Sequence, residues 1–400
     1  MMFFCNFTAR HYTLIMKYPK RKDLTAFFLL KKEGWMIFIC LGLLLKMGML
    51  PIKTGDYNLY LEPWLNFIKT HGYTSSLKFD FYNYTPSYIY ILITLAKIGL
   101  NPLYSIKIVS IVFEYVLAYY VGRIAYLKYK DNLVLWIAFA VIPLLPTVLL
   151  NSSYLSQCDS IYAAFVVGSI YFILKKEQFL SLLFLGIAFA FKMQAILLLP
   201  FYFVLLLRRN IRWYYFLLIP VVFILSITPA WIFGRSFTEL LNIYLLQAEQ
   251  FRYLTLNFPN IYCWISNDFY EPIRIAGVGL TVLLTLYSGW WLSKKRFSFT
   301  YENWIKLAFL SAIIVPFILP GMHERYMYLG DVLGVLYYLV LRRNIHLPLG
   351  ILLVSTYSYI RCSRYNDMLP MEPAFFIYFL VILFTSIDFV TGLKQETNDI

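Results

Sequence analysis

The chain has 400 residues, of which 60% are hydrophobic and only 14% are charged, whereas soluble globular proteins average about 25% charged residues. Its formal net charge is +14, but the basic residues cluster at the ends of apolar runs, as the positive-inside rule requires, which argues against a nucleic-acid partner. Apolar runs long enough to cross a bilayer as helices recur from Trp35 onward. The alternating pattern of a transmembrane barrel is absent, so the sequence predicts an all-α integral membrane protein.

The basic residues predict the orientation of the chain. Residues 1–33 hold several of them before the first apolar run and are expected to form a cytoplasmic segment. Residues 34–400 are expected to form one transmembrane domain in the plasma (inner) membrane, with both termini cytoplasmic. Further basic groups are expected on the cytoplasmic side, at 128–130, 175–176, 208–212, 294–296 and 342–344.

Eleven to thirteen spans are expected. They are placed at about 34–52, 103–127, 132–150, 159–174, 178–191, 194–207, 214–233, 272–292, 303–319, 326–341, 347–360 and 372–390. The apolar segment 86–100 is not counted, because a crossing there would move the basic group at 128–130 to the outside. It is short, starts at Pro86 and is followed by "GLNP", so we expect an interfacial or re-entrant helix.

Two stretches are therefore expected outside the membrane. Residues 53–102 form a first external loop that carries juxtamembrane helices, and residues 234–270 form a second large loop that is too polar and aromatic to cross. This topology places several polar residues on one extracytoplasmic face. They are Asp56, Asp159, Lys192 and the adjacent residues His323, Glu324 and Arg325.

Two carboxylates on this face are candidate site residues. Asp56, just past the first span, is either a solvated loop residue or a general base held near the membrane surface. Asp159 opens a span, where the helix dipole stabilises an acidic side chain without any functional role. Gln157 beside it adds hydrogen-bonding capacity that a helix cap does not require.

The cationic candidates also have two interpretations each. Lys192 interrupts an apolar hairpin and is either an anchor that reaches the lipid headgroups or a phosphate contact. Glu324 and Arg325 could form a surface ion pair of little energetic worth. However, Pro316 and Pro320 are expected to break the preceding helix, and Gly321 allows a turn that aims these side chains into a cavity. Arginine binds phosphate through a planar fork of donors, and histidine can donate to an anionic oxygen.

One candidate base and several cations suggest a reaction class. A glycosidase needs a second carboxyl group to protonate a poor alcohol leaving group. A transferase with a phosphate leaving group needs only a base for the acceptor hydroxyl and cations for the departing anion. The inventory of this sequence fits the transferase.

At this point the chain resembles the GT-C glycosyltransferases, integral membrane enzymes that take sugars from polyprenyl- or dolichyl-phosphate donors. "GDYNLYLEPWLNFIKTHG" and "FYNYTPSYIYILI" are similar to the first external loop of that family. "SQCDSIY", the hairpin "FLSLLFLGIAFAFKMQAILLLP" and "HERYMY" resemble motifs of bacterial mannosyltransferases related to those of glycosylphosphatidylinositol synthesis. These motifs run in order from about residue 53 to residue 330.

The resemblance implies roles for individual residues. It makes Asp56 the catalytic base and Lys192, His323 and Arg325 the contacts of the donor phosphate. It gives Asp159 a part in positioning the sugar or the acceptor. Further substrate-binding candidates are Tyr84 of "YNYTP", Gln157 and Glu324, of which Glu324 is expected first to orient Arg325.

One departure from the family concerns metal dependence. The acidic pair often seen in the first loop is Thr54-Gly55-Asp56 here, without an acid at position 54. This favours a metal-independent mechanism without a cofactor, although the family includes metal-dependent members.

The resulting prediction is an inverting glycosyltransferase. It would move mannose or another hexose from a polyprenyl-phosphate donor to a glycan or glycolipid acceptor. Two alternatives stay open. A flippase of lipid-linked saccharides should show charges along a path within its spans, or inverted repeats. A polymerase or ligase of the same fold would use an oligosaccharide donor.

Overall fold

The computed structural model describes residues 30–295, 300–364 and 369–398. These residues are almost entirely helical, and their one described strand pairing joins β1 (Thr255–Leu256) to β2 (Met322–His323) in parallel. The all-α prediction is thus confirmed for the described part of the chain. Of the basic segment predicted for residues 1–33, all but the last four residues lie outside that part.

Most of the described chain consists of α-helices that are joined by short helical turns or loops. Along the chain the α-helices are α3 (Lys32–Met49), α4 (Glu62–His71), α5 (Pro86–Ile98), α6 (Pro102–Tyr129), α7 (Leu133–Leu144), α8 (Pro146–Val148), α9 (Asp159–Leu174), α10 (Gln178–Phe191), α11 (Leu199–Leu207), α12 (Leu218–Ile232), α13 (Phe237–Leu241), α14 (Ile243–Gln250), α15 (Tyr270–Lys294), α16 (Tyr301–Ile318), α17 (Tyr328–Leu341), α18 (His346–Arg364) and α19 (Glu372–Asn398). Tighter or wider helical turns join them at Tyr57–Leu61, Ser75–Lys78, Leu149–Tyr154, Met193–Leu198, Trp213–Leu217, Asn267–Phe269 and Glu324–Met327.

Several of these helices can cross a membrane, so the chain is a multi-pass membrane protein. Within the described residues, five helical segments are long and apolar enough, at Pro102–Tyr129, Trp213–Ile232, Asn267–Lys294, Tyr301–Ile318 and Glu372–Leu393. A sixth is added if α7 and the segment Pro146–Tyr154, bent by 55°, form one span.

Other expected spans coincide with helices shorter than a bilayer. Helix α9 has the expected bounds, but its 16 residues measure only about 24 Å at 1.5 Å per residue, against a hydrocarbon core of about 30 Å. Helix α10 and the segment Met193–Leu207 are short as well, because the chain breaks between them at Lys192. The total of eleven to thirteen spans stays a prediction.

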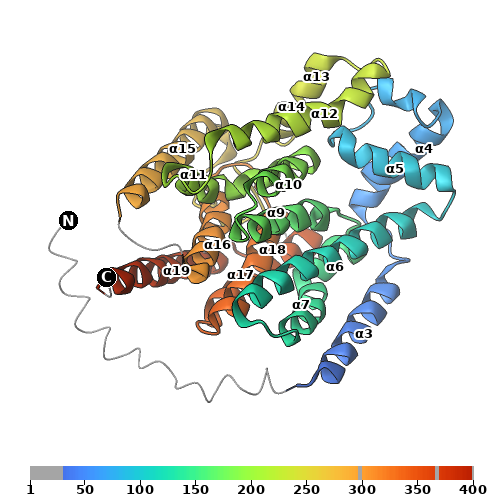
Figure 1. The fold of residues 1–400 in the computed structure, drawn as a ribbon. Helices are drawn as coiled ribbons and strands as arrows, with labels where there is room; N and C mark the ends of the chain where they lie inside the picture. Colours follow the sequence, from blue (N-terminus) through green and yellow to red (C-terminus); the bar gives the residue numbers. More distant parts are fainter. Residues whose placement is uncertain (1–29, 296–299, 365–368, 399–400) are drawn as a thin grey trace.

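The centre of the bundle is built around α9. This helix is buried along almost its whole length and packs against α6 and α10. Gly168 allows the close approach, since a Cβ atom there would lie 2.7 Å from the ring of Phe184 on α10. Helices α16 and α17 pack together, and α18 joins α17 to α19. Figure 1 shows α3 at one edge of this bundle and α15 at the other.

Helix α6 runs from one end of the bundle to the other, and a lysine near each of its ends contacts another segment. Near its first residue, the Lys107 Nζ donates to the backbone oxygens of Met49 and Ile52, next to the first loop. Near its last residue, about 40 Å away for a helix of this length, the Lys128 Nζ lies 2.6 Å from Glu302. The Arg343 Nη2 is 3.7 Å from the same carboxylate. The basic groups at 128–130 and 342–344 thus lie together at one end of the bundle. This agrees with the prediction that both face the same, cytoplasmic side.

The two predicted external loops lie together at the other end. Figure 1 shows α4, α5 and α13 gathered there. Helix α5 has 13 residues and ends at Gly99, whose φ of 78° caps it in the left-handed conformation. An ion pair links the loops, between Arg235 and Asp80, and the Asn83 Nδ2 donates to the Gln250 Oε1 at 2.6 Å.

One sequence expectation about the turn after α16 needs correction. Pro316 does not break that helix, which continues to Ile318. The Leu319 N–H still donates to the Val315 carbonyl, at 2.8 Å, so the regular pattern survives the proline. The chain turns instead at Pro320 and Gly321, where Gly321 has a φ of 76°.

Candidate functional site

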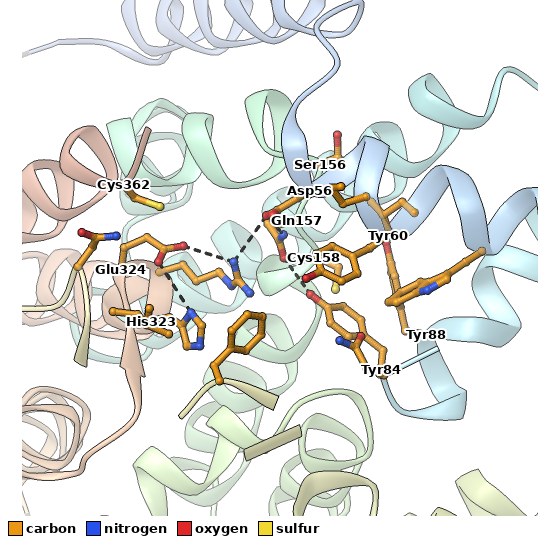
Figure 2. A pocket seen from close by; sticks show the side chains of 18 residues that line it. Asp56, Tyr60, Tyr84, Tyr88, Ser156, Gln157, Cys158, His323, Glu324 and Cys362 are labelled. Atoms are coloured by element: carbon orange, nitrogen blue, oxygen red, sulfur yellow. Dashed lines mark hydrogen bonds and ion pairs between the residues drawn. The ribbon is translucent and has the colours of Figure 1, made fainter. Parts of the chain in front are cut away.

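A cavity of about 270 Å³ opens between the two predicted external loops and the turn after α16. Most of the candidate site residues line it. They are Asp56, Tyr84, Gln157, His323, Glu324 and Arg325. Figure 2 shows the labelled ones, Asp56, Tyr84, Gln157, His323 and Glu324, converging from the first loop, the segment before α9 and the turn before α17. Segments more than 250 residues apart in the sequence, at Asp56 and at His323, therefore form one site.

Asp56 is held on one side by an amide. It lies just before the turn Tyr57–Leu61, and its Oδ2 accepts a hydrogen bond from the Gln157 Nε2 at 2.5 Å. The Gln157 Oε1 in turn accepts from the Tyr84 hydroxyl at 3.0 Å. Burial raises the pKa of Tyr84 to about 12, so its hydroxyl keeps the proton that it donates. These two consecutive hydrogen bonds, from Tyr84 to Gln157 and from Gln157 to Asp56, fix the direction in which the Asp56 carboxylate points.

Arg325 lines the same cavity and lies beside Asp56. Its Nη1 lies 3.6 Å from the Asp56 Oδ2 and 3.3 Å from the Glu324 Oε1. Burial by itself lowers the pKa of Arg325, but the acidic groups around it, of which Glu324 contributes most, together outweigh burial and hold that pKa well above its ordinary value. The guanidinium is thus always charged. Its Nε is buried and has no hydrogen-bond partner among the described residues, which leaves a donor for an incoming anion.

Glu324 is a buried carboxylate next to Arg325. Its side chain is only 7% exposed and contacts Arg325. Burial raises the pKa of Glu324 above its ordinary value. Its carboxylate lies between two neighbours, with Oε1 3.3 Å from the Arg325 Nη1 and Oε2 3.9 Å from the His323 Nδ1, so the orienting role expected for Glu324 stays a prediction.

His323 is a neutral member of the site. Burial, Arg325 and Lys192 together lower its pKa to about 3. Its ring lies 5.2 Å from that of Phe251 and 5.1 Å from that of Tyr326, between centroids. At neutral pH the imidazole therefore offers one N–H donor and one acceptor, and it can donate to a phosphate oxygen without adding charge.

This low pKa predicts an acid-labile fold. In the unfolded chain histidine titrates near 6.5, so as pH falls from about 6.5 toward 3 the unfolded state binds a proton that the folded state refuses, and stability decreases. We expect His323→Gln to flatten this part of the profile, measured as the thermal unfolding midpoint in detergent between pH 7 and 4. Because the pKa of Glu324 is raised in the folded state, its protonation in acid favours folding. This contribution is present in the wild-type protein and in the His323 variant alike, so it cancels in their comparison. Equal slopes for the two proteins would contradict the prediction.

Lys192 lines a second, smaller cavity of about 80 Å³. The two cavities share part of their walls, namely Asn83, Tyr84, Phe251, His323 and Arg325. The Lys192 side chain is 9% exposed and forms an ion pair with Asp159, and its Nζ lies 5.2 Å from the centroid of the Tyr84 ring. A buried, paired ammonium does not reach the lipid headgroups, so the interpretation of Lys192 as a plain anchor is wrong.

Asp159 lies behind Lys192 and lines neither cavity. Its carboxylate is 2% exposed; besides Lys192 it accepts a hydrogen bond from the Asn151 Nδ2 at 2.6 Å. Cys158, not Asp159, is the N-cap of α9. In this structure the visible task of Asp159 is to hold Lys192; direct positioning of a sugar or acceptor stays a prediction.

Sequence reasoning missed several residues of the walls. They include Asn83, Ser156, Gln194, Gln247, Gln250, Phe251, Asn257 and Cys362. The only signal for Asn83 was its place in the "YNYTP" motif, and for Phe251 and Asn257 the aromatic, polar character of the second loop. Asn257 has a φ of 54°, and its Oδ1 accepts from the Arg361 Nη1 at 2.8 Å. No local pattern marks Cys362, which comes from α18.

The described residues contain no group of three or more His, Cys, Asp or Glu side chains that could hold a metal ion. Comparisons of the chain with protein-family models, with curated proteins and with solved structures found no match. The family resemblance therefore depends on the sequence motifs alone, and the function has to be argued from the site.

Proposed function

We propose that the chain is an inverting glycosyltransferase of the GT-C type. It moves a monosaccharide from a polyprenyl-phosphate donor to a hydroxyl of a lipid-linked glycan or polysaccharide, on the extracytoplasmic face. The observation that supports this most is that Asp56 and Arg325 line one cavity, with 3.6 Å between the Asp56 Oδ2 and the Arg325 Nη1. A candidate base and an anion-binding cation thus belong to one site, and the substrates of an in-line reaction would have to enter between them.

The proposed reaction is a single displacement at the anomeric carbon. Asp56 removes the proton of the acceptor hydroxyl, and that oxygen forms a bond to the anomeric carbon from one side. The bond from this carbon to the phosphate oxygen breaks on the other side, and its electron pair leaves on the polyprenyl phosphate. In-line attack inverts the configuration. Arg325 and Lys192 stabilise the charge of the departing phosphate, and His323 donates a hydrogen bond to it.

Besides supplying the sugar, the donor would separate Arg325 from Asp56 when it binds. At 3.6 Å it is an ion pair without good hydrogen-bond geometry. A phosphate placed beside Arg325 offers a doubly accepting partner that suits the guanidinium fork better. Binding of the donor therefore turns Arg325 toward the phosphate and frees the Asp56 Oδ2 to accept the proton of the acceptor.

The finer architecture belongs to the same proposal. Eleven to thirteen spans would require α3, α17 and α18 to cross in addition to the five or six candidate spans. The shorter apolar helices α9, α10 and the segment Met193–Leu207 would also have to cross, through a locally thinned or water-lined region. Helices α4 and α5 would then lie at the membrane surface, which is compatible with their position at one end of the bundle. Residues 53–102 and 234–270 would both face the extracytoplasmic side.

A transporter of lipid-linked saccharides is the second candidate, since one observation favours it. Lys46 on α3 and Glu114 on α6 form an ion pair of 2.6 Å inside the bundle, with side chains 1% and 0% exposed. Charges within spans often mark transport pathways. However, this pair lines neither of the two cavities at the external loops, and a closed ion pair between two helices also serves to join them.

The deciding experiment is a transfer assay with the purified protein in lipid vesicles. We would supply short-chain polyprenyl phosphates carrying one radiolabelled hexose, together with candidate glycolipid acceptors. The proposal expects label in a new glycosidic bond, of inverted anomeric configuration. Movement of label across the bilayer without a new bond would identify a transporter. Transfer only from oligosaccharide donors would identify a polymerase or ligase.

A further inference from the structure

The smaller cavity beside Lys192 is lined by an unusual number of amides. Four amide side chains contribute to it, from three separate segments: Asn83, Gln194, Gln247 and Gln250. Asn83 comes from the first external loop, Gln194 follows α10, and the other two lie on α14. Such an inventory is typical of sites that bind many hydroxyl groups, because each amide presents both donors and an acceptor.

The hydrogen bonds among these amides leave much of their capacity free. The Gln247 Nε2 donates to the Asn83 backbone oxygen, and the Gln250 Oε1 accepts from the Asn83 Nδ2. The Asn83 Oδ1 is buried and has no partner among the described residues. Gln194 is half-buried, and no hydrogen bond of its amide occurs within the described part of the chain. A buried polar group without a partner costs free energy, so the cavity wall favours a polar ligand.

The charges of this cavity restrict the ligand further. Lys192 and Arg325 line it, and no carboxylate does. The carboxylates that pair with these cations lie outside the lining, namely Asp159 beside Lys192, and Asp56 and Glu324 beside Arg325. An anionic phosphate is therefore favoured beside the two cations, whereas an additional cationic group such as a sugar amine has no carboxylate to meet.

The size of the cavity sets an upper limit to the ligand. At the roughly 15 Å³ that one water needs on this measure, a volume of 80 Å³ holds about five waters. This is room for one sugar ring and not for an oligosaccharide. The rings of Tyr84, Phe251 and Tyr326 contribute apolar wall against which a sugar face can pack.

We infer that this amide-lined cavity is the donor-sugar subsite, which takes one neutral hexose attached to a phosphate. The inference rests on the proposed function, because that function supplies the polyprenyl-phosphate sugar as the ligand. Gln194 and Gln247 would recognise the hydroxyl groups of the ring, and Lys192 and Arg325 the phosphate. The acceptor would then approach from the larger cavity, where Asp56 lies.

The test measures binding rather than transfer, so that it does not depend on catalysis. The dissociation constants of the full-length protein in nanodiscs are compared for three ligands of known charge. They are farnesyl phosphate carrying one mannosyl group, the same phosphate carrying a 4-amino-4-deoxy hexose, and farnesyl methyl phosphate, a diester that lacks the sugar. We expect the neutral hexose to improve binding over the methyl diester by about tenfold, and the amino sugar to give no gain.

Two variants assign that gain to the amides. Gln194→Leu and Gln247→Leu should each remove most of the tenfold gain, leaving the affinity for farnesyl methyl phosphate within about twofold. Glu249→Ala is the matched control, because Glu249 is exposed on α14 and lines neither cavity. It should retain the full gain.

The outcomes separate this inference from the proposed function. An equal affinity of the wild-type protein for the mannosyl and methyl diesters overturns the subsite, even if the transfer assay succeeds. A gain that survives both glutamine substitutions overturns it as well. A gain that the substitutions remove supports the subsite even in a protein that transfers no sugar, in which case the proposed function alone fails.

Discussion

Replacing Asp56 with asparagine is expected to lower the rate of sugar transfer by about 10²–10⁴-fold, the usual contribution of a general base. The substitution removes the proton acceptor but keeps a side chain of the same shape. Its amide oxygen can still accept the hydrogen bond that the Gln157 Nε2 now gives to the carboxylate. The measurement is the turnover number with saturating polyprenyl-phosphate sugar and acceptor.

The same variant should bind the donor about as well as the wild-type protein. Donor binding depends on the cations, and Asp56 competes with the phosphate for Arg325, so a modest gain in affinity is the direction expected. Glu62→Gln provides the matched control. Glu62 lies in the same loop, in an exposed ion pair with Lys53, and lines neither of the cavities beside Asp56. Full activity of the Asp56 variant, or equal losses in both variants, would rule out Asp56 as the base.

Local sequence signals were sufficient to place many of the helices. The bounds of α9 and α10 agree with the segments predicted from the sequence, because basic or polar residues interrupt the apolar runs at 175–176 and at Lys192. The same signals overestimated the effect of Pro316, which removes one hydrogen bond of α16 but leaves the helix continuous to Ile318. Whether the shorter helices cross the membrane depends on their surroundings, which an apolar run does not encode.

The site was only partly visible in the sequence for a different reason. Asp56 and the residues at 323–325 stood out because charge is rare in this chain, and charge-based topology put them on one face. The pairing of Lys192 with Asp159 joins residues 33 positions apart and depends on how α9 and α10 pack. Uncharged wall residues such as Gln194 and Cys362 carry no comparable signal. Their participation follows from the fold alone.

Lys192→Met is expected to destabilise the protein strongly, by about 3–5 kcal/mol, the usual cost of removing one partner of a buried ion pair. The Asp159 carboxylate would remain at 2% exposure with one hydrogen bond, from Asn151. The thermal unfolding midpoint in detergent measures the effect. A change of less than about 1 kcal/mol would show that water or a rearranged side chain replaces the ammonium, and would contradict the buried pair.

The double variant Lys192→Met with Asp159→Asn separates stability from function. Neutralising both partners removes the unpaired charge, and the new amide can keep its hydrogen bonding with Asn151, so most of the lost stability should return. Transfer activity should not return. The site still lacks one of the two cations assigned to the departing phosphate, a loss worth roughly 10²–10³ in rate where such a group stabilises the transition state. A double variant that recovers both stability and activity would reduce Lys192 to a structural partner of Asp159. Arg325 would then be the cation that alone receives the leaving group.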